Sequence, residues 1–252
     1  SLGMSASPPR PRTARTGRRR FVVAAGAVLV LTTVGAWFLW GGGPQPGDHA
    51  PLAICAVDDT TLRADVDADG HLDLVRDPRR DGSSQVVFRR GSDRTTVDVG
   101  SARGFWQKLR GASKDDMVTK GAFGDFDGDG HVDLALFYSQ AHRGDDPTHH
   151  MVAHEVHYGP LARDLRSERT GTVDVVSTTF VYGLRATDQD RDGRSELQMF
   201  QSEGDGVVGH YSGVRSGKGG KDRIVMSDER GTWYDMAGWP RYKPGWRDFG
   251  VC

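Results

Sequence analysis

Three acidic loops of one design place the strongest constraint on how this chain can fold. Each carries acids at its first, third, fifth and ninth positions and glycine at its sixth, and the loops span residues 65–73, 125–133 and 188–196. Four carboxylates this close repel one another unless a cation neutralises them, and the glycine permits a sharp turn around the ion. The loops begin 60 residues (65 to 125) and 63 residues (125 to 188) apart. This regular period indicates stacked or radial structural repeats.

The chemistry of the loops favours calcium. Hard oxygen ligands without sulfur or imidazole suit Ca²⁺, and the seventh residue of such a loop contributes its backbone carbonyl rather than its side chain. The predicted ligands are Asp65, Asp67, Asp69, His71 and Asp73; Asp125, Asp127, Asp129, His131 and Asp133; and Asp188, Asp190, Asp192, Arg194 and Glu196. The alternative for any single loop is a charged surface turn without an ion, and three copies argue against it. The third loop, which has glutamate at its ninth position and two arginines within it, is expected to be the weakest site.

The residues that follow each loop exclude a helix–loop–helix calcium motif. An EF-hand carries a bidentate glutamate at its twelfth position and continues into a helix. The twelfth positions here are Arg76, Leu136 and Met199, and the following segments, such as HVDLALF at 131–137, are rich in β-forming residues. EF-hand and dockerin interpretations therefore fail on the ligand and on the flanking structure.

Short apolar runs bounded by turn residues predict an all-β domain. Residues 84–90, 132–138 and 151–158 are rich in β-branched and aromatic side chains and are flanked by glycine, proline or aspartate. Each unit reads as a strand, an acidic loop, a second strand and two further strands. The tail 232–249 contains tryptophans but no acidic loop, and it reads as a partial fourth unit or a cap.

The central loop with its flanks resembles the FG-GAP repeat, also called the VCBS repeat, of integrin-α-like β-propellers. The resemblance rests on AFGDFDGDGHVDL at 122–134, on the two weaker copies and on the period near 60, and it covers about residues 50–230. In that family the loop joins the first two strands of a propeller blade and binds Ca²⁺. The resemblance implies that the acids at positions one, three, five and nine of each loop are side-chain ligands.

The resemblance also implies a fold, which the length of the chain limits. Rings of this family have six or seven blades, and closed propellers have about four to eight. At about 60 residues a blade, the region 50–252 holds three blades and a fraction. We expect a propeller-like array of about three to four four-stranded blades, the fourth built partly from residues 232–252 and the segment near Cys55. An open fan of three blades and completion of the ring by oligomerisation are the alternatives.

The amino-terminal 40 residues predict a membrane anchor. Residues 21–40 are 20 residues without a charge, about 30 Å as a helix, which matches the core of a bilayer. Arginines crowd the preceding residues 1–20, expected to be a disordered cytoplasmic tail, so the positive-inside rule places the chain after a flexible linker at 41–49 outside the cytoplasm. A cleaved signal peptide is the alternative, and the run RRRFV at 18–22 resembles a twin-arginine export signal. Both interpretations export the domain 50–252.

The charge distribution argues against nucleic-acid binding. The formal net charge is −1, but residues 1–40 hold six of the 33 basic residues and no acid, which leaves 27 basic and 34 acidic residues elsewhere. The exported part therefore lacks the basic excess that a nucleic-acid-binding domain carries.

The two cysteines bracket the exported region. Cys55 and Cys252 predict one disulfide joining its ends in an oxidising compartment, with two unpaired thiols as the alternative. In a propeller-like array, this disulfide would fasten the first strand to the last.

Two other motifs carry less weight. His150, His154 and His157 have metal-compatible spacing, but a strand places His157 on the opposite face, so we expect a solvated loop and strand face. The tripeptide 143–145 (RGD) is expected to be a chance occurrence in an exposed loop.

No enzyme motif accounts for these features. The chain has no G-x-S-x-G, P-loop or Rossmann fingerprint. We therefore expect a membrane-anchored, extracytoplasmic calcium-binding module, not an enzyme, that binds a protein or glycan ligand or mediates adhesion, with calcium in a structural role. The alternatives are an enzyme acting on surface polysaccharide with the propeller as scaffold, and a structural envelope protein that binds copies of itself.

Overall fold

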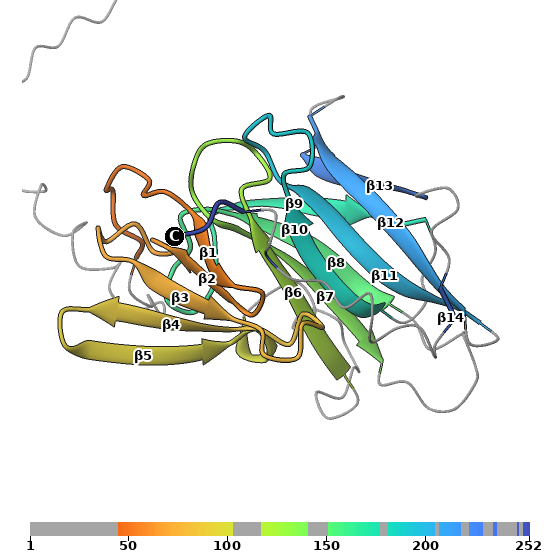
Figure 1. Ribbon diagram of the computed structural model, residues 1–252, viewed down its shortest axis with the longest axis horizontal. Coiled ribbons are helices and arrows are strands. Elements are labelled where there is room, and N and C mark those ends of the chain that lie inside the picture. Colours follow the sequence, from red (N-terminus) through yellow and green to blue (C-terminus); the bar gives the residue numbers. More distant parts are fainter. Residues whose placement is uncertain are drawn as a thin grey trace, which may run out of the picture. The chain divides into compact units, whose positions relative to one another are not determined.

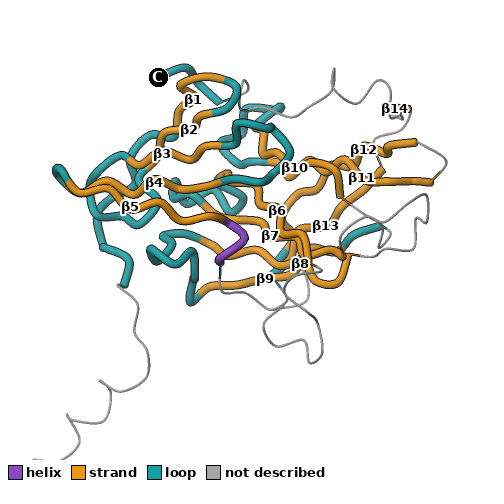
Figure 2. The backbone as a smooth tube through the Cα atoms, turned by 90° about the horizontal axis from the view of Figure 1, so that it is seen from below, coloured by secondary structure: helices purple, strands orange, loops and turns teal. Residues whose placement is uncertain are grey.

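The computed structural model describes residues 45–102, 117–140, 151–176, 181–204, 207–217, 222–228, 234–235, 246 and 249–252. Within these ranges the protein is all-β, with one short 3₁₀ helix, η1 (Val99–Ser101), after β5 (Figure 2). The tail 1–20, the apolar segment 21–40, linker residues 41–44 and the RGD tripeptide lie outside the described residues. In the described part, no helix has the length and apolar character needed to cross a membrane.

The strands form two sheets (Figure 1). The first sheet, orange to yellow, has the order β1-β2-β3-β4-β5: β1 (Cys55–Asp58), β2 (Thr61–Ala64), β3 (Asp73–Arg76), β4 (Gln85–Arg90) and β5 (Asp93–Asp98). The second sheet, green to blue, has the order β10-β11-β12-β13-β9-β8-β7-β6: β6 (Met117–Gly124), β7 (Asp133–Gln140), β8 (Met151–Tyr158), β9 (Arg169–Asp174), β10 (Val181–Thr187), β11 (Glu196–Gly204), β12 (Val207–Ser216) and β13 (Arg223–Asp228). A short strand, β14 (Tyr234–Asp235), also pairs with β12.

The two sheets contain three four-stranded antiparallel meanders. These are β2 to β5, β6 to β9 and β10 to β13, and in each the consecutive strands pair antiparallel. Each acidic loop connects the first strand of a meander to its second. The repeated order of strands and loops predicted from the sequence is therefore present in the fold.

The second and third meanders merge into one sheet instead of standing apart. The outer strands β9 and β13 pair in parallel, with Ile224 opposite Val173. At the other side of the same sheet, β6 lies against β10, so the sheet is nearly closed and barrel-like. Gly124 permits this approach, because a Cβ there would lie 2.4 Å from the Cβ of Ala186 on β10. The all-β prediction is confirmed, and the ring of separate blades stays a prediction.

One hydrophobic core runs through all three meanders. In β7 the consecutive residues Leu134 to Tyr138 are all buried, as expected of a strand covered on both faces. In β2, by contrast, Leu62 and Ala64 alternate with half-buried polar residues, the pattern of a strand with one covered face. Both strands contribute to the same cluster of buried side chains. The exposed strand β5 is polar and charged, which suits the edge of the first sheet.

The two ends of the exported region meet beside β1. Cys55 and Cys252 form a disulfide that spans 197 positions of sequence, so the predicted pairing is confirmed. Ala56 donates from its N–H to the carbonyl of Gly250 (2.8 Å) and accepts from the N–H of Cys252 (3.0 Å). The last residues thus extend the first sheet past β1, although most of the tail expected to build a fourth blade lies outside the described residues.

The start of the described chain also contacts the first acidic loop. The N–H of Gly47 donates to the carbonyl of Asp67 (2.7 Å), and that of His49 donates to the carbonyl of Ala68 (3.2 Å). Residues 45–49, predicted as the end of a linker, therefore lie along the loop.

Replacing both cysteines should destabilise the protein strongly. A crosslink over 197 positions restricts the unfolded chain, so the Cys55→Ser/Cys252→Ser protein is expected to lose about 2–5 kcal/mol of unfolding free energy. Urea unfolding of the full-length protein measures the loss. Dithiothreitol should lower the stability of the wild type to that of the variant and leave the variant unchanged. Equal midpoints for oxidised wild type and variant would contradict the disulfide.

Candidate metal centre

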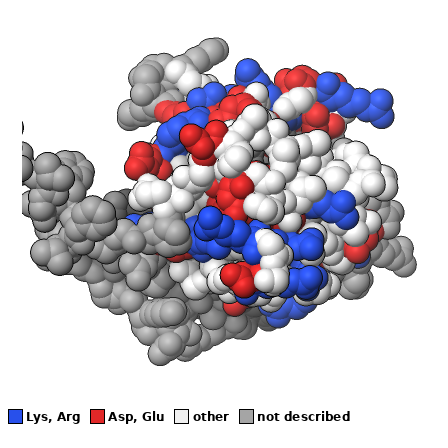
Figure 3. All heavy atoms as spheres, turned by 90° about the vertical axis from the view of Figure 1, so that its left-hand side faces the viewer, with Lys and Arg blue, Asp and Glu red and all other residues white. Residues whose placement is uncertain are grey.

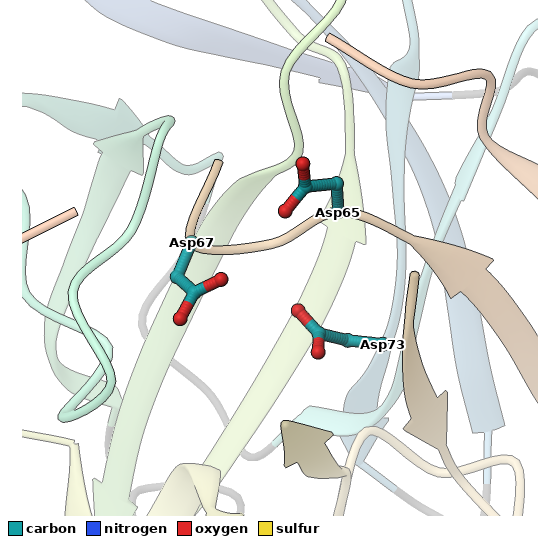
Figure 4. Close-up of side chains that lie close together, drawn as sticks. All are labelled: Asp65, Asp67 and Asp73. Carbon is teal, nitrogen blue, oxygen red and sulfur yellow. The ribbon is translucent and has the colours of Figure 1, made fainter. Parts of the chain in front are cut away.

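Each acidic loop gathers three carboxylates into one group. The groups are Asp65, Asp67 and Asp73; Asp125, Asp127 and Asp133; and Asp188, Asp190 and Glu196, and within each the oxygens lie within 4.8 Å of one another. In the first loop the three carboxylates are turned toward a shared space (Figure 4). The first, third and ninth positions of the sequence motif therefore converge, as a metal site requires.

The backbone of the loops explains why these positions converge. In every loop the first acid follows directly after a strand and the ninth begins the next strand. The sixth residue is a glycine with a left-handed backbone, with φ of 83° at Gly70, 87° at Gly130 and 84° at Gly193. This conformation is accessible to glycine without steric cost, so the turn reverses the chain within nine residues.

The first acid of each loop holds the turn by accepting hydrogen bonds from its backbone. Asp65 accepts from the N–H of Gly70 (2.9 Å), Asp125 from that of Gly130 (2.8 Å), and Asp188 from that of Gly193 (3.2 Å). The same bond thus forms between positions one and six in all three loops. The loops share a conformation as well as a sequence pattern.

The ninth acid joins the loop to the rest of its meander. Asp73 accepts from the N–H of Val66 (3.1 Å) in its own loop and from the N–H of Arg89 (2.7 Å) in β4. Asp133 likewise accepts from Phe126 (2.7 Å) in its loop and from Gly159 (2.7 Å), just after β8. In both cases the carboxylate connects the loop to the third strand of the meander.

Burial disfavours the ionised form of these carboxylates. Asp73 and Asp133 are fully buried. Burial, together with the neighbouring loop carboxylates, raises the pKa of Asp73 to about 7 and that of Asp133 to about 8, although hydrogen bonds from backbone N–H groups oppose the shift. Burial raises the pKa of Asp65 and Asp125 as well. A bound cation would remove this cost.

Two oxygens in the loops have the properties of open ligand positions. Oδ1 of Asp67 and Oδ1 of Asp188 are buried and accept no hydrogen bond. A buried carboxylate oxygen without a partner costs free energy, and Asp67 itself is only 3% exposed. The residues present therefore fit a hard divalent cation.

Arginines that the sequence analysis did not identify neutralise part of the negative charge of two loops. Arg163 donates from Nε to Oδ2 of Asp67 (2.6 Å) and from NH2 to Oδ2 of Asp69 (3.0 Å). Arg169 pairs in the same way with Asp127 and with Asp129, at 2.9 Å from the latter. Acidic and basic side chains interleave on the face shown in Figure 3. The arginines lie 96 and 42 residues from Asp67 and Asp127, and no sequence pattern marks the pairing.

The fifth acids are not part of the three groups. Oδ2 of Asp69 and of Asp129 is held by an arginine, and Oδ1 of each accepts from the N–H of the seventh residue, His71 or His131, at 2.9 Å. In the third loop, Asp192 accepts from the N–H of Arg194 (2.8 Å). The fifth acids therefore brace the turn, and their role as ligands stays a prediction, as does that of the carbonyls of His71, His131 and Arg194.

The third loop offers the least protected group. Asp190 is exposed, whereas the three acids grouped in each of the first two loops are buried. Its ninth residue, Glu196, accepts from the N–H of Gln189 (2.9 Å). The longer glutamate thus makes the same bond to position two that the ninth-position aspartates make in the other two loops. Solvent reaches this site more readily than the other two, and its being the weakest of the three stays a prediction.

The second and third loops also hold each other. Ser195 donates from its N–H to the carbonyl of Asp125 (2.6 Å) and accepts from the N–H of Asp125 at its Oγ (3.0 Å). Beside them lies a cavity of about 330 Å³ lined by Pro51, Leu52, Ala53, Ile54, Asp125, Gly130, Asp188, Gly193, Ser195, Phe249 and Gly250. Both carboxylates of this lining are first residues of acidic loops.

One member of the histidine segment, His157, has a structural role. His157 is 3% exposed, and its ring contacts the carbonyl of Leu165 (2.7 Å) and the carboxylate of Glu155 (3.1 Å). The expectation of a solvated face was therefore wrong for His157, because β8 turns this side chain into the domain. His142, His149 and His150 lie outside the described residues.

Comparison with known proteins adds no assignment. No protein-family model, no curated protein and no solved structure matches this chain.

Cation binding to the first two loops should depend on pH. With pKa values of about 7 and 8, Asp73 and Asp133 bind protons at neutral pH in the cation-free fold, whereas both are ionised in the unfolded chain. Their protonation therefore favours the cation-free fold most in acid, and this contribution is lost as the pH rises through 7 to 8. A divalent cation needs the ionised form, so its affinity should rise over the same range. Calorimetric titration at pH 6.0 and 8.5 tests this, and equal affinities would contradict it.

Proposed function

We propose that residues 50–252 form a calcium-stabilised, propeller-type repeat module that binds a protein or glycan ligand outside the cell membrane. Calcium has a structural role in this proposal: it neutralises the clustered carboxylates and fixes the hairpins. The observation that carries the proposal is the recurrence of one oxygen-only group at the same place in three four-stranded meanders.

The choice of calcium follows from the ligand chemistry. The grouped side chains are carboxylates alone, without sulfur or imidazole, which favours a hard cation. Calcium accepts larger and less regular sets of oxygen ligands than magnesium does, so irregular carboxylate loops suit it better. Affinities of about 10⁻⁴–10⁻³ M are enough for extracellular modules, and weak sites such as the third loop would still fill there.

Two features favour a location outside the cytoplasm. The Cys55–Cys252 disulfide is of the kind that persists in oxidising compartments. The uncharged residues 21–40 after an arginine-rich tail favour a retained single-pass anchor with the tail 1–20 in the cytoplasm, and secretion after signal cleavage is the alternative.

The meanders support a propeller-type origin of the repeat. In each, the acidic loop joins the first two of four antiparallel strands, which is the place it takes in an FG-GAP or VCBS blade. We propose that the chain builds three such blades and that the disulfide fastens their ends.

The cavity beside the second and third loops is the proposed ligand site. It combines the apolar segment Pro51–Ile54 with carboxylates of two calcium loops. A ligand there would contact residues whose position depends on both ions, so its binding would require calcium. Both carboxylates in this cavity belong to the proposed calcium loops, so in this proposal they hold ions and do not act as a catalytic acid and base. This favours a binding module over the polysaccharide-cleaving enzyme.

Calcium should raise the melting temperature of the full-length protein above its value in EDTA. In the Asp67→Asn variant, one of the two stronger sites is impaired, so more than a third of that rise should be lost if distant sites add. The matched control is Asp93→Asn, an exposed acid at the start of β5 that should leave the rise unchanged. A wild-type melting temperature that is the same in calcium and EDTA would refute the calcium proposal.

Ligand binding is tested on glycan and protein arrays with and without calcium. The proposal predicts retention that EDTA abolishes and that Ala53→Trp, which fills the cavity, weakens at unchanged melting temperature. Val214→Trp, on an exposed position of β12, is the matched control and should bind normally. Cleavage of an arrayed glycan would instead support the enzyme, and calcium-dependent growth of particle mass in light scattering would support self-association.

A further inference from the structure

A fourth loop of the same design connects β3 to β4. It comprises Asp77-Pro78-Arg79-Arg80-Asp81-Gly82-Ser83-Ser84-Gln85, with an aspartate at its first and fifth positions and a glycine at its sixth. Asp77 follows directly after β3, and the ninth residue, Gln85, begins β4. The loop thus meets its flanking strands at the same positions as the acidic loops do, although it joins the second and third strands of its meander and the acidic loops join the first and second.

Its backbone repeats their conformation at both left-handed positions. Gly82, at position six, has φ 85°, against 83°, 87° and 84° for the corresponding glycines of the acidic loops. Arg80, at position four, has φ 51°, against 51° for Ala68, 78° for Gly128 and 61° for Arg191. A left-handed backbone is unfavourable for residues other than glycine. Three of the four loops nevertheless have a non-glycine residue in this conformation at position four, which reflects a shared loop conformation.

Its hydrogen bonds also repeat those of the acidic loops. Asp77 accepts from the N–H of Gly82 (2.7 Å), the bond between positions one and six. Asp81 accepts from the N–H of Ser83 (2.9 Å), the bond between positions five and seven that Asp69 makes with His71. The loop therefore shares the conformation of the acidic loops, although its sequence keeps only two of their four acids.

The loop differs at the two positions that would complete a metal site. Position three is Arg79 and position nine is Gln85, where the other loops have acids. Gln85 turns to Asp98 on β5, with its Nε2 3.4 Å from Oδ1 of that residue. Only two carboxylates remain in this loop, and a divalent cation would lack the carboxylate ligands that positions three and nine supply in the acidic loops.

A lysine from the next meander supplies a positive charge to this loop. Lys120, on β6, is 5% exposed, and its Nζ donates to the carbonyl of Asp81 (2.9 Å) and lies 3.4 Å from Oδ2 of the same residue. A lysine this buried is rare and needs a partner for its charge. We propose that the Lys120 ammonium serves as the built-in cation of this loop, paired with its fifth acid as Arg163 and Arg169 are paired with the fifth acids of the first two loops.

The loop at 77–85 lies at the contact between the first sheet and the second. The N–H of Gly121 on β6 donates to the carbonyl of Gly82 (2.7 Å), and the Oγ of Ser84 donates to the carbonyl of Gly121 (3.3 Å). The second half of the loop is thus hydrogen-bonded to β6, and β6 belongs to the second sheet. Lys120 holds the joint between the first and second sheets, and this joint does not depend on calcium.

The Lys120→Met variant tests the role of the ammonium. It keeps an unbranched apolar stem but leaves buried Asp77 and half-buried Asp81 without the ammonium. The melting temperature of the full-length protein should fall by about 6–20 °C, by the same amount in calcium and in EDTA. Arg90→Met, at an exposed position of β4, is the matched control and should change it little.

A rescue variant separates a cation role from simple packing. Arg79→Asp and Gln85→Asp added to Lys120→Met place acids at positions one, three, five and nine around Gly82. In calcium this triple variant should regain stability and bind one more ion than Lys120→Met, while in EDTA it should be less stable than Lys120→Met. The same comparison applies if Lys120→Met does not fold, because the triple variant should then fold in calcium only.

Two outcomes would overturn the proposal. One is a Lys120→Met protein as stable as the wild type, and the other is a triple variant that calcium stabilises no more than it stabilises Lys120→Met, although the wild type responds to calcium. The rescue rests on the proposed calcium binding, whereas the Lys120→Met result does not. Loss of stability in Lys120→Met together with a wild type indifferent to calcium would refute the proposed function and leave the role of Lys120 standing.

Discussion

The mutual repulsion of buried carboxylates is the constraint on which this structure depends. Three hairpins close through nine-residue turns in which the first and ninth acids are tied to backbone N–H groups, and this bonding forces the side chains together. The turns cannot relax by moving the acids apart without losing those bonds. Positive charge must therefore come from elsewhere, and the raised pKa values of Asp73 and Asp133 show how far burial alone disfavours the ionised form.

The chain meets this need in different ways at different loops. Arg163 and Arg169 each pair with the third and fifth acids of one of the first two loops. Oδ1 of Asp67 still has no hydrogen-bond partner, and we assign the ligand positions that the arginines leave open to calcium. In the loop after β3, which lacks two of the acids, Lys120 supplies the positive charge in our proposal. Calcium would then fix the hairpins within the meanders, and the lysine would fix the first sheet to the second. Loss of calcium should loosen the loops before it separates the sheets.

The sequence predicted the local structure well and the long-range structure poorly. The acidic motif and the alternation of apolar residues located the loops, most strands and the all-β class, because these depend on neighbouring residues. The disulfide was predicted because only Cys55 and Cys252 were available to pair. The arginine pairs and the parallel contact of β9 with β13 depend on residues that are distant in sequence, and no local pattern encodes them. The loop at 77–85 was overlooked because Arg79 and Gln85 replace two of its acids, which leaves only an ordinary Asp-Gly turn signal to be read.

Counting the bound ions tests the central claim most directly. Equilibrium dialysis of the full-length protein against radioactive calcium at millimolar concentration, at pH 8, gives the number of ions per chain. We predict two ions bound more tightly, in the loops at 65–73 and 125–133, and a third bound more weakly at 188–196, where the three carboxylate groups lie. Absence of bound calcium at millimolar concentration would contradict the account.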